Sequence, residues 1–145
     1  MIVVVTRLHV RWWRFLPSFV VHVWRIRRQA QLSAGFLGGA LAGELPRDFW
    51  TFTVWTDEPA MRAFQTAAPH VNTMSRLPHW CDEASYVHWQ QDDASLPTPT
   101  AALERMRDGG NLSKVDHPSA AHAAGKTTAD VEPKLAGLAM RPRHI

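Results

Sequence analysis

The chain has 145 residues, of which 46% are hydrophobic and 20% charged, so it can bury the core of one ordinary domain. The net charge is only +3 and the basic residues do not gather in one long run, which argues against a nucleic-acid partner. The single cysteine, Cys81, excludes an internal disulfide and fits a reducing cytoplasm.

The first predicted element is a strand over residues 2–10, because Val and Ile dominate this stretch. Arg7 and Arg11 interrupt the apolar start too early for a signal sequence. No apolar stretch reaches the ~18 residues that a membrane helix requires. We therefore expect a soluble, cytoplasmic protein that has no membrane partner.

A helix and a second strand follow. Pro17 and Ser18 are typical of a helix start, and apolar residues then recur at helical spacing until Gly35, which is typical of a helix end. The second predicted strand, residues 36–44, contains three glycines. Glycines inside a strand indicate a bulge or a close approach by another part of the chain.

The third predicted strand, residues 49–55, has the clearest pattern, because aromatic and β-branched residues fill it. Thr56 or Asp57 is expected to cap the next helix, and Pro69 to break that helix before a second helical piece begins. Residues 84–89 form the fourth predicted strand.

The resulting order is β-α-β-β-α-β, the ferredoxin-like motif of α+β proteins, and we expect it to span residues 1–92. Such a unit leaves one apolar sheet face open, and two units commonly bury these faces on each other, so we expect a homodimer. Residues 93–145 add a short helix at 101–107 and then an extended or partly disordered tail, since no aromatic residue occurs from Asn111 onward.

Five short segments of the first 92 residues, and one in the tail, can be compared with known families. They are Gly35-Phe36-Leu37-Gly38-Gly39, Phe49-Trp50-Thr51-Phe52-Thr53-Val54-Trp55, Asp57-Glu58-Pro59-Ala60-Met61-Arg62-Ala63-Phe64, Pro69-His70, Trp80-Cys81-Asp82-Glu83-Ala84 and, more loosely, Ser113-Lys114-Val115-Asp116-His117-Pro118-Ser119. Together they resemble the dimeric α/β-barrel proteins related to antibiotic-biosynthesis monooxygenases. The resemblance is closer to an uncharacterised monooxygenase-like branch near spheroidene monooxygenase.

The resemblance implies a dimeric α/β barrel with an aromatic-lined cavity in each subunit. It implies oxidation of a hydrophobic aromatic, polyketide-like or terpenoid small molecule, with either no cofactor or haem. His70 is the catalytic candidate, as a general base on an acidic phenol or enol, or as the haem iron ligand. The alternative is a surface or capping histidine at a kinked helix.

Candidates for substrate binding lie on three of the predicted strands. They are Arg7, His9, Trp50, Phe52, Trp55, Tyr86 and His88. Arg7 and His9 share one face of the first strand, because side chains alternate along a strand. On a cavity face they would hold an anionic substrate or haem propionates; on a solvent face they would be solvated charges.

The aromatic candidates divide between two faces of the third strand, Trp50 and Phe52 on one and Trp55 on the other. One face is expected to line the cavity and the other to pack on helices, with plain core packing as the alternative. Tyr86 and His88 share a face of the last strand, where a structural hydrogen-bonding role is the alternative.

The segment 79–83 brings a histidine, a cysteine and two acids together, but its spacing matches no structural zinc pattern. We therefore predict no metal, except iron at His70 if haem is bound. Two other functions stay open. One is a non-catalytic small-molecule or haem-binding dimer, and the other is a cofactor-free isomerase or dehydratase of the same fold.

Overall fold

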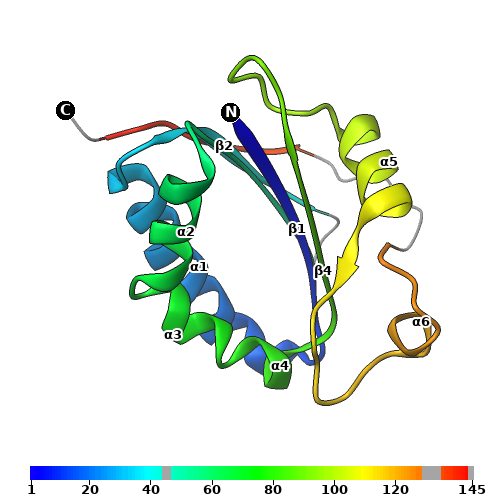
Figure 1. The fold of residues 1–145 in the computed structure, drawn as a ribbon. Coiled ribbons are helices and arrows are strands. Elements are labelled where there is room, and N and C mark those ends of the chain that lie inside the picture. Colours follow the sequence, from blue (N-terminus) through cyan, green and yellow to red (C-terminus); the bar gives the residue numbers. More distant parts are fainter. Residues whose placement is uncertain (44–46, 129–134, 144–145) are drawn as a thin grey trace.

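The computed structural model describes residues 1–43, 47–128 and 135–143. Within these residues, six strands form one antiparallel sheet in the order β5-β4-β1-β3-β2-β6 (Figure 1). The strands are β1 (Ile2–Val10), β2 (Phe36–Ala42), β3 (Asp48–Trp55), β4 (Cys81–Gln90), β5 (Asn111–Leu112) and β6 (Leu135–Met140).

Helices lie on both sides of this sheet (Figure 1). On one side are α1 (Leu16–Leu32), α2 (Glu58–Thr66), α3 (His70–Met74) and α4 (Leu77–Trp80), and on the other are α5 (Pro99–Gly109) and α6 (Ala120–Ala123). A short 3-10 helix, η1 (Trp13–Phe15), leads into α1. Within the described ranges, no helix has the length and apolar character needed to cross a bilayer.

The predicted α+β, ferredoxin-like fold class is confirmed. The four central strands run β4-β1-β3-β2, and α1 and α2 make the two crossovers of the βαββαβ unit. Strand β4 begins at Cys81, earlier than the predicted residue 84, because Cys81 pairs with Val10 beyond a β-bulge at Asp82 of β4. The end of the predicted segment 36–44 lies outside the described residues.

The junctions between elements have the local chemistry that the sequence predicts. Asp57 caps α2, and its carboxylate accepts a hydrogen bond of 2.9 Å from the backbone N–H of Ala60. Gly35 is the last residue of the loop between α1 and β2 and has a φ of +81°. A Cβ at this position would lie 2.5 Å from the Cβ of Ala60. Gly39 allows the close approach of a neighbouring strand, since a Cβ would lie 2.5 Å from the Phe52 carbonyl oxygen.

On the side of α1 to α4, the sheet packs through two separate apolar clusters. The buried members of the first are Leu8, Val10, Phe19, Leu77, Trp80, Cys81, Ala84 and Val115. The buried members of the second are Ile2, Ala30, Phe36, Trp55, Met61, Phe64 and Met140. We refer to them as the first and second helix-side clusters.

The opposite sheet face packs under α5. Its cluster joins Ala102, Leu103 and Met106 of α5 to Val3, Val5, Ala40, Ala42, Trp50, Phe52, Val54 and Val87 of four strands. The open apolar face expected from the sequence is therefore covered by the chain itself. The physical reason is that α5 places three apolar side chains on its sheet-facing side, where they remove the strand residues from water.

The segment after residue 92 also extends the sheet at both edges. Strand β5 pairs with β4, and β6 pairs with β2. Beyond β6, the side-chain amide of Gln31 in α1 donates a hydrogen bond of 3.0 Å to the Arg141 carbonyl. Segments on both sides of residue 92 thus share one sheet and one core. Parts of the predicted tail, residues 129–134 and 144–145, lie outside the described residues.

Candidate functional site

A strip of polar side chains crosses the helix-facing side of the sheet. In one row, Thr6 of β1 lies between Thr51 of β3 and Tyr86 of β4. In the next row, Val4 lies between Thr53 and His88. Because side chains two residues apart share a face, the six residues of these two rows form one continuous surface. We call these six residues the polar strip.

Solvent reaches the polar strip even though helices lie on that side of the sheet. Tyr86 is 39% exposed and His88 is exposed, while the two threonines of β3 are half-buried. On the other face of β3, by contrast, Trp50 and Phe52 are fully buried. A helix-covered sheet face is normally apolar and closed at its centre, so an accessible row of hydroxyls and an imidazole there has the composition of a binding surface.

An apolar wall with aromatic rings borders the strip. The indole N–H of Trp55 donates a hydrogen bond of 3.1 Å to the Thr53 hydroxyl. The Trp55 ring lies 4.9 Å from that of Phe64, whose ring lies 4.7 Å from the His70 imidazole. The predicted residues Trp55, Tyr86, His88 and His70 therefore lie on the same side of the sheet.

His70 is held in one orientation at the start of α3. Its backbone N–H donates to the side-chain oxygen of Gln29 at 2.8 Å, and its Nδ1 lies 3.0 Å from the Gln65 carbonyl oxygen. A carbonyl can only accept, so Nδ1 carries the proton in the neutral ring and Nε2 is the basic nitrogen. Burial lowers the pKa of His70, which favours the neutral imidazole.

Arg7 and His9 lie on the opposite face of the sheet, in a polar network at one end of β1. The Arg7 guanidinium donates a hydrogen bond of 2.8 Å to Glu83, and its other end lies 3.1 Å from an Asp48 oxygen. The second Glu83 oxygen accepts a hydrogen bond from the Ser119 hydroxyl. Two carboxylates of the chain thus already balance the charge of Arg7, which was expected to bind an anionic substrate or haem propionates.

Burial and pairing shift the pKa values of Asp48 and Glu83, the two carboxyl groups beside Arg7, in opposite directions. Burial raises the pKa of Asp48, and the nearby Arg7 charge only partly opposes this. Burial also acts to raise the pKa of Glu83, but the hydrogen bond and charge of Arg7, helped by Ser119, outweigh it and lower the pKa. Glu83 is therefore the firmly ionised partner of Arg7.

A metal ion fits this network poorly. Ligand atoms of His9, Asp82 and Glu83 lie within 4.8 Å of one another. However, His9 Nδ1 is 2.6 Å from an Asp82 oxygen, and both Glu83 oxygens are hydrogen-bonded to Arg7 and Ser119. A cation would have to displace these bonds beside a guanidinium, so the arrangement favours a structural network.

Haem does not fit the arrangement that the sequence analysis expected. His70, the expected iron ligand, lies on the helix side, whereas Arg7, the expected propionate partner, is 3% exposed on the other side. Arg11, the next arginine along the chain, donates to the His79 carbonyl. The expected iron ligand and the expected propionate partner therefore lie on opposite sides of the sheet, where one haem group cannot contact both.

Trp50 and Phe52 occupy the cluster under α5, and neither has exposed surface to offer a substrate. Four strip residues, Val4, Thr6, Thr51 and Thr53, were not singled out from the sequence. The signal for two of them was the alternation of threonine with bulky residues in β3, which indicates that the two faces of the strand differ in polarity.

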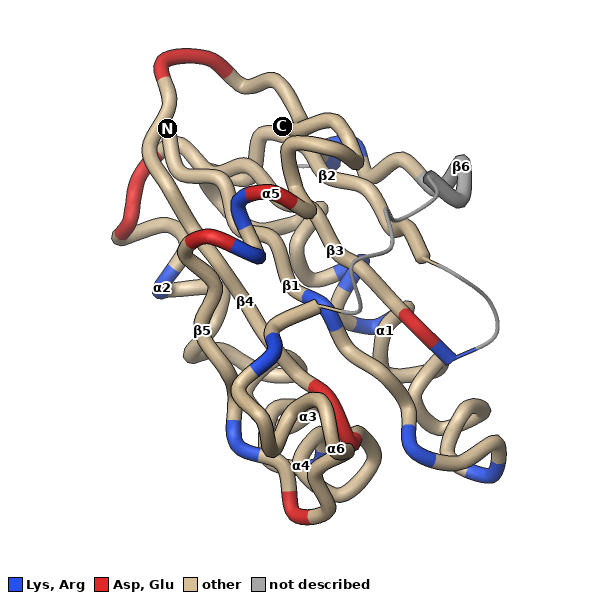
Figure 2. Tube along the Cα trace, turned by 90° about the vertical axis from the view of Figure 1, so that its right-hand side faces the viewer, with Lys and Arg blue, Asp and Glu red and all other residues tan. Residues whose placement is uncertain are grey.

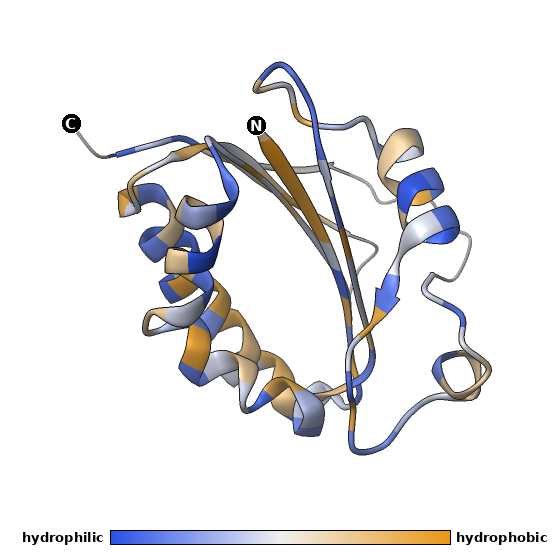
Figure 3. Cartoon of the chain, in the orientation of Figure 1, coloured by the Kyte–Doolittle hydropathy of each residue, from blue (hydrophilic) through white to orange (hydrophobic). Residues whose placement is uncertain are grey.

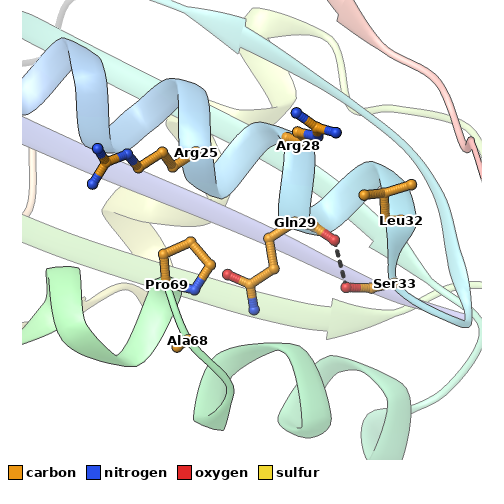
Figure 4. Close-up of a pocket in the computed structure, with 7 residues that line it drawn as sticks. All are labelled: Arg25, Arg28, Gln29, Leu32, Ser33, Ala68 and Pro69. Carbon is orange, nitrogen blue, oxygen red and sulfur yellow. Dashed lines mark hydrogen bonds between the residues drawn. The ribbon is translucent and has the colours of Figure 1, made fainter.

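A shallow groove lies elsewhere, between α1 and the break that separates α2 from α3 (Figure 4). Its volume is about 510 Å³, and its lining residues are Arg25, Arg28, Gln29, Leu32, Ser33, Ala68 and Pro69. The Gln29 amide ties the two sides together through bonds to the Phe64 and Ala67 carbonyls. The groove contains none of the residues of the polar strip.

Several solved structures share this fold. A protein from Nitrosomonas europaea assigned as an antibiotic biosynthesis monooxygenase is 14% identical, with a TM-score of 0.57, over 63% of this chain and 98% of its own. SnoaB of Streptomyces nogalater, described as a cofactor-independent oxygenase, is 17% identical, with a TM-score of 0.53, over 63% and 93%. Rv0793 of Mycobacterium tuberculosis is 11% identical, with a TM-score of 0.58, over 65% and 98%.

No protein-family model matches the chain, and no curated protein sequence matches it. At these identities, the solved structures show a common fold and leave the chemistry open. They also leave about a third of this chain unmatched, although they are themselves matched over nearly their whole length.

Proposed function

We propose that this protein is a monooxygenase-like enzyme that oxidises a hydrophobic, phenolic or enolic small molecule on the polar strip. The observation that carries the proposal is the accessible row of hydroxyls and imidazole between two apolar helix-side clusters. Apolar walls with a few polar groups are the usual composition of a small-molecule site. The likeness to SnoaB, described as a cofactor-independent oxygenase, supports oxidation without a cofactor.

In this proposal, the substrate lies along the strip with its polar substituent against the threonine hydroxyls and Tyr86. Neutral His70 takes a proton from an activated C–H or O–H group through Nε2. The resulting carbanion adds to O₂, and the His70 imidazolium returns its proton to the peroxide anion. Loss of water from this hydroperoxide, which takes the remaining hydrogen of the same carbon, then leaves a carbonyl group. The strip hydroxyls donate hydrogen bonds to the enolate oxygen and stabilise its charge.

Oxygen consumption by the purified protein tests this function. We expect uptake with an anthrone as probe, with one O₂ consumed and one water released for each carbonyl formed. His70→Gln is expected to lower turnover at least tenfold with little change in probe affinity, since general bases contribute about 10²–10⁴-fold. Tyr86→Phe and Thr51→Val are expected to weaken probe binding.

His117→Gln, in the exposed segment before α6, serves as the matched control and is expected to retain full activity. Loss of turnover in His88→Gln but not in His70→Gln would assign the base to His88 on the strip. Binding of the probes without any turnover would favour the non-catalytic small-molecule protein. Product formed equally well without oxygen would favour an isomerase or dehydratase.

A visible spectrum tests the remaining cofactor alternative. Because the residues proposed for haem do not converge, we expect no Soret band in the protein fraction after haemin is added and the unbound haemin is removed. A band that His70→Ala abolishes would overturn this expectation and support the haem-binding alternative. The closer relation to the branch near spheroidene monooxygenase stays a prediction from the sequence.

A further inference from the structure

The first part of the chain has an unusual charge distribution. Residues 1–43 contain six arginines and no lysine, aspartate or glutamate, while the whole chain is only +3. Three of these arginines, Arg14, Arg25 and Arg28, have exposed side chains on η1 and α1. In Figure 2 every charged position of η1 and α1 is blue. The exposed surface of η1 and α1 is therefore cationic.

The same surface exposes large apolar side chains. Trp12 and Trp13 are 54% and 60% exposed before α1, and Trp24 is 48% exposed within it. Val20 and Val21 are also exposed. At helical spacing, these two valines and Trp24 form one stripe on α1, away from the core-facing stripe that contains Phe19. Helix α1 is therefore apolar on an outer face as well as an inner one.

Arginines accompany the exposed indoles. The Arg27 guanidinium lies 5.0 Å from the Trp24 ring centroid, and that of Arg47 lies 5.9 Å from the Trp13 ring centroid. Figure 3 shows hydrophobic and hydrophilic residues alternating along α1. Tryptophan beside arginine is the composition of the membrane–water interface, where indole rings lie at headgroup level and cations pair with phosphates.

The groove of Figure 4 continues this surface. Arg25 and Arg28 stand on its α1 side, and Ala68 and Pro69 lie across from them. Leu32, also a lining residue, is 52% exposed. The groove thus combines two cations with apolar walls, which suits a phosphate headgroup attached to a hydrocarbon chain.

We propose that the surface made by Trp12, Trp13, Val20, Val21, Trp24 and the exposed arginines binds anionic membrane surfaces. Charge complementarity decides between the occupants. A second copy would bring cationic surface against cationic surface, and like charges across an interface are repulsive. Nucleic acid would pair with the arginines but would not bury the valines. The valines are stabilised most by burial at the boundary between lipid headgroups and acyl chains. The proposal revises the expectation of no membrane partner.

Cosedimentation with vesicles tests the proposal on the full-length protein. We expect binding to phosphatidylcholine vesicles containing about 30% phosphatidylserine and at least tenfold weaker binding to pure phosphatidylcholine, since each basic residue near an anionic surface adds to the attraction. Binding is expected to fall as salt is raised. The variant Arg14→Glu/Arg25→Glu/Arg28→Glu is expected to bind at least tenfold more weakly.

The matched charge control is Arg76→Glu/Lys114→Glu/Lys126→Glu, which makes the same change at exposed positions outside this surface and is expected to bind as the wild type does. The variant Trp12→Ala/Trp13→Ala/Trp24→Ala is expected to lose binding, whereas Val71→Ala/Met74→Ala/Leu96→Ala, also exposed, is expected to keep it. Circular dichroism is the check that each variant is folded.

Three outcomes would overturn the proposal. One is equal binding by the two charge variants. Another is binding to an oligonucleotide but not to vesicles, which would assign the surface to nucleic acid. The third is a dimer that the tryptophan variant dissociates, which would assign it to a second copy. None of these readouts depends on oxygenase activity, so failure of the proposed function leaves the result intact.

Discussion

Arg7 shows how much the surroundings of one residue decide about its role. The side chain is 4% exposed and contacts the carboxylates of Asp48 and Glu83, whose side chains are 16% and 17% exposed. Removing a buried cation leaves the charges of its partners without compensation. The network therefore makes Arg7 a structural residue in the folded protein.

Substitution of Arg7 tests this role. We expect Arg7→Met to lower the free energy of unfolding by about 3 kcal/mol, the value typical of breaking a buried ion pair from one side. Urea denaturation measures the loss. The matched control is Arg62→Met, which removes an exposed ion pair with Glu58 within α2 and should cost less than about 0.5 kcal/mol. Equal effects of both variants would contradict a structural role for Arg7.

The lowered pKa of His70 predicts how stability depends on pH. Folding favours the neutral ring, so the unfolded state binds the proton more readily, and stability rises with pH between the two pKa values. We expect the protein to lose stability as pH falls below 6.5, the ordinary pKa of histidine, and through the lower pKa of His70 in the folded state. His70→Gln should show a smaller loss over this window.

Denaturation curves measured between pH 5 and pH 8, a range of about 3 units around the ordinary histidine pKa, check this expectation. The variant His88→Gln is the comparison, because His88 is an exposed imidazole on the same side of the sheet. An identical pH dependence in His70→Gln and the wild type would show that another group titrates. Cys81, whose pKa burial raises to about 12, stays a thiol throughout the range.

At the scale of secondary structure, α5 has the largest consequence. Three of its residues, Ala102, Leu103 and Met106, cover the sheet face that the βαββαβ pattern alone leaves open. Its first turn is capped by the Thr98 hydroxyl, which accepts a hydrogen bond of 3.1 Å from the Ala101 N–H. The helix is therefore part of the core.

Truncating one α5 side chain tests this packing. We expect Leu103→Ala to cost about 2–4 kcal/mol in the free energy of unfolding, because it leaves a cavity in the cluster that contains Trp50 and Phe52. Glu104→Ala, at the neighbouring exposed position, should stay within about 0.5 kcal/mol of the wild type. A loss below about 1 kcal/mol for Leu103→Ala would mean that α5 contributes little to the core.

For the whole molecule, the homodimer inferred from the sequence stays a prediction. The sheet face on which it was based is covered by α5, so a dimer must use another surface or displace that helix. We expect light scattering to give twice the mass of one 16.4 kDa chain. The mass of a single chain would contradict this expectation.

Some elements of the fold could be predicted from the sequence because local chemistry fixes them. Asp57, Gly35 and the aromatic strand β3 act through local chemistry, namely capping, a positive φ and a pleated surface, so their positions could be read directly. The alternation within β3 also separated Trp50 and Phe52 from Trp55. It could not say which face would be open to solvent, because both faces of this strand are rich in large or β-branched residues.

The candidate site was predictable only in part for the same reason. His70, Trp55, Tyr86 and His88 were chosen for their chemistry, and the structure places them on one side of the sheet. Arg7 and His9 were chosen by the same reasoning, yet they lie on the other side among Asp48, Asp82 and Glu83. Those carboxylates come from two distant strands, so local spacing contained no signal that they would pair.

The sequence by itself determined the order of the elements in the βαββαβ unit, the boundaries of its strands to within a few residues, and which side chains share a strand face. These properties follow from backbone preferences and from side-chain periodicity, which are local. Only the tertiary structure decided that α5 closes one sheet face, that Arg7 is neutralised within the chain, and that the polar strip stays open to solvent on the other face. Each of these depends on contacts between segments far apart in the chain, because burial and charge pairing are set by whatever packs across the sheet.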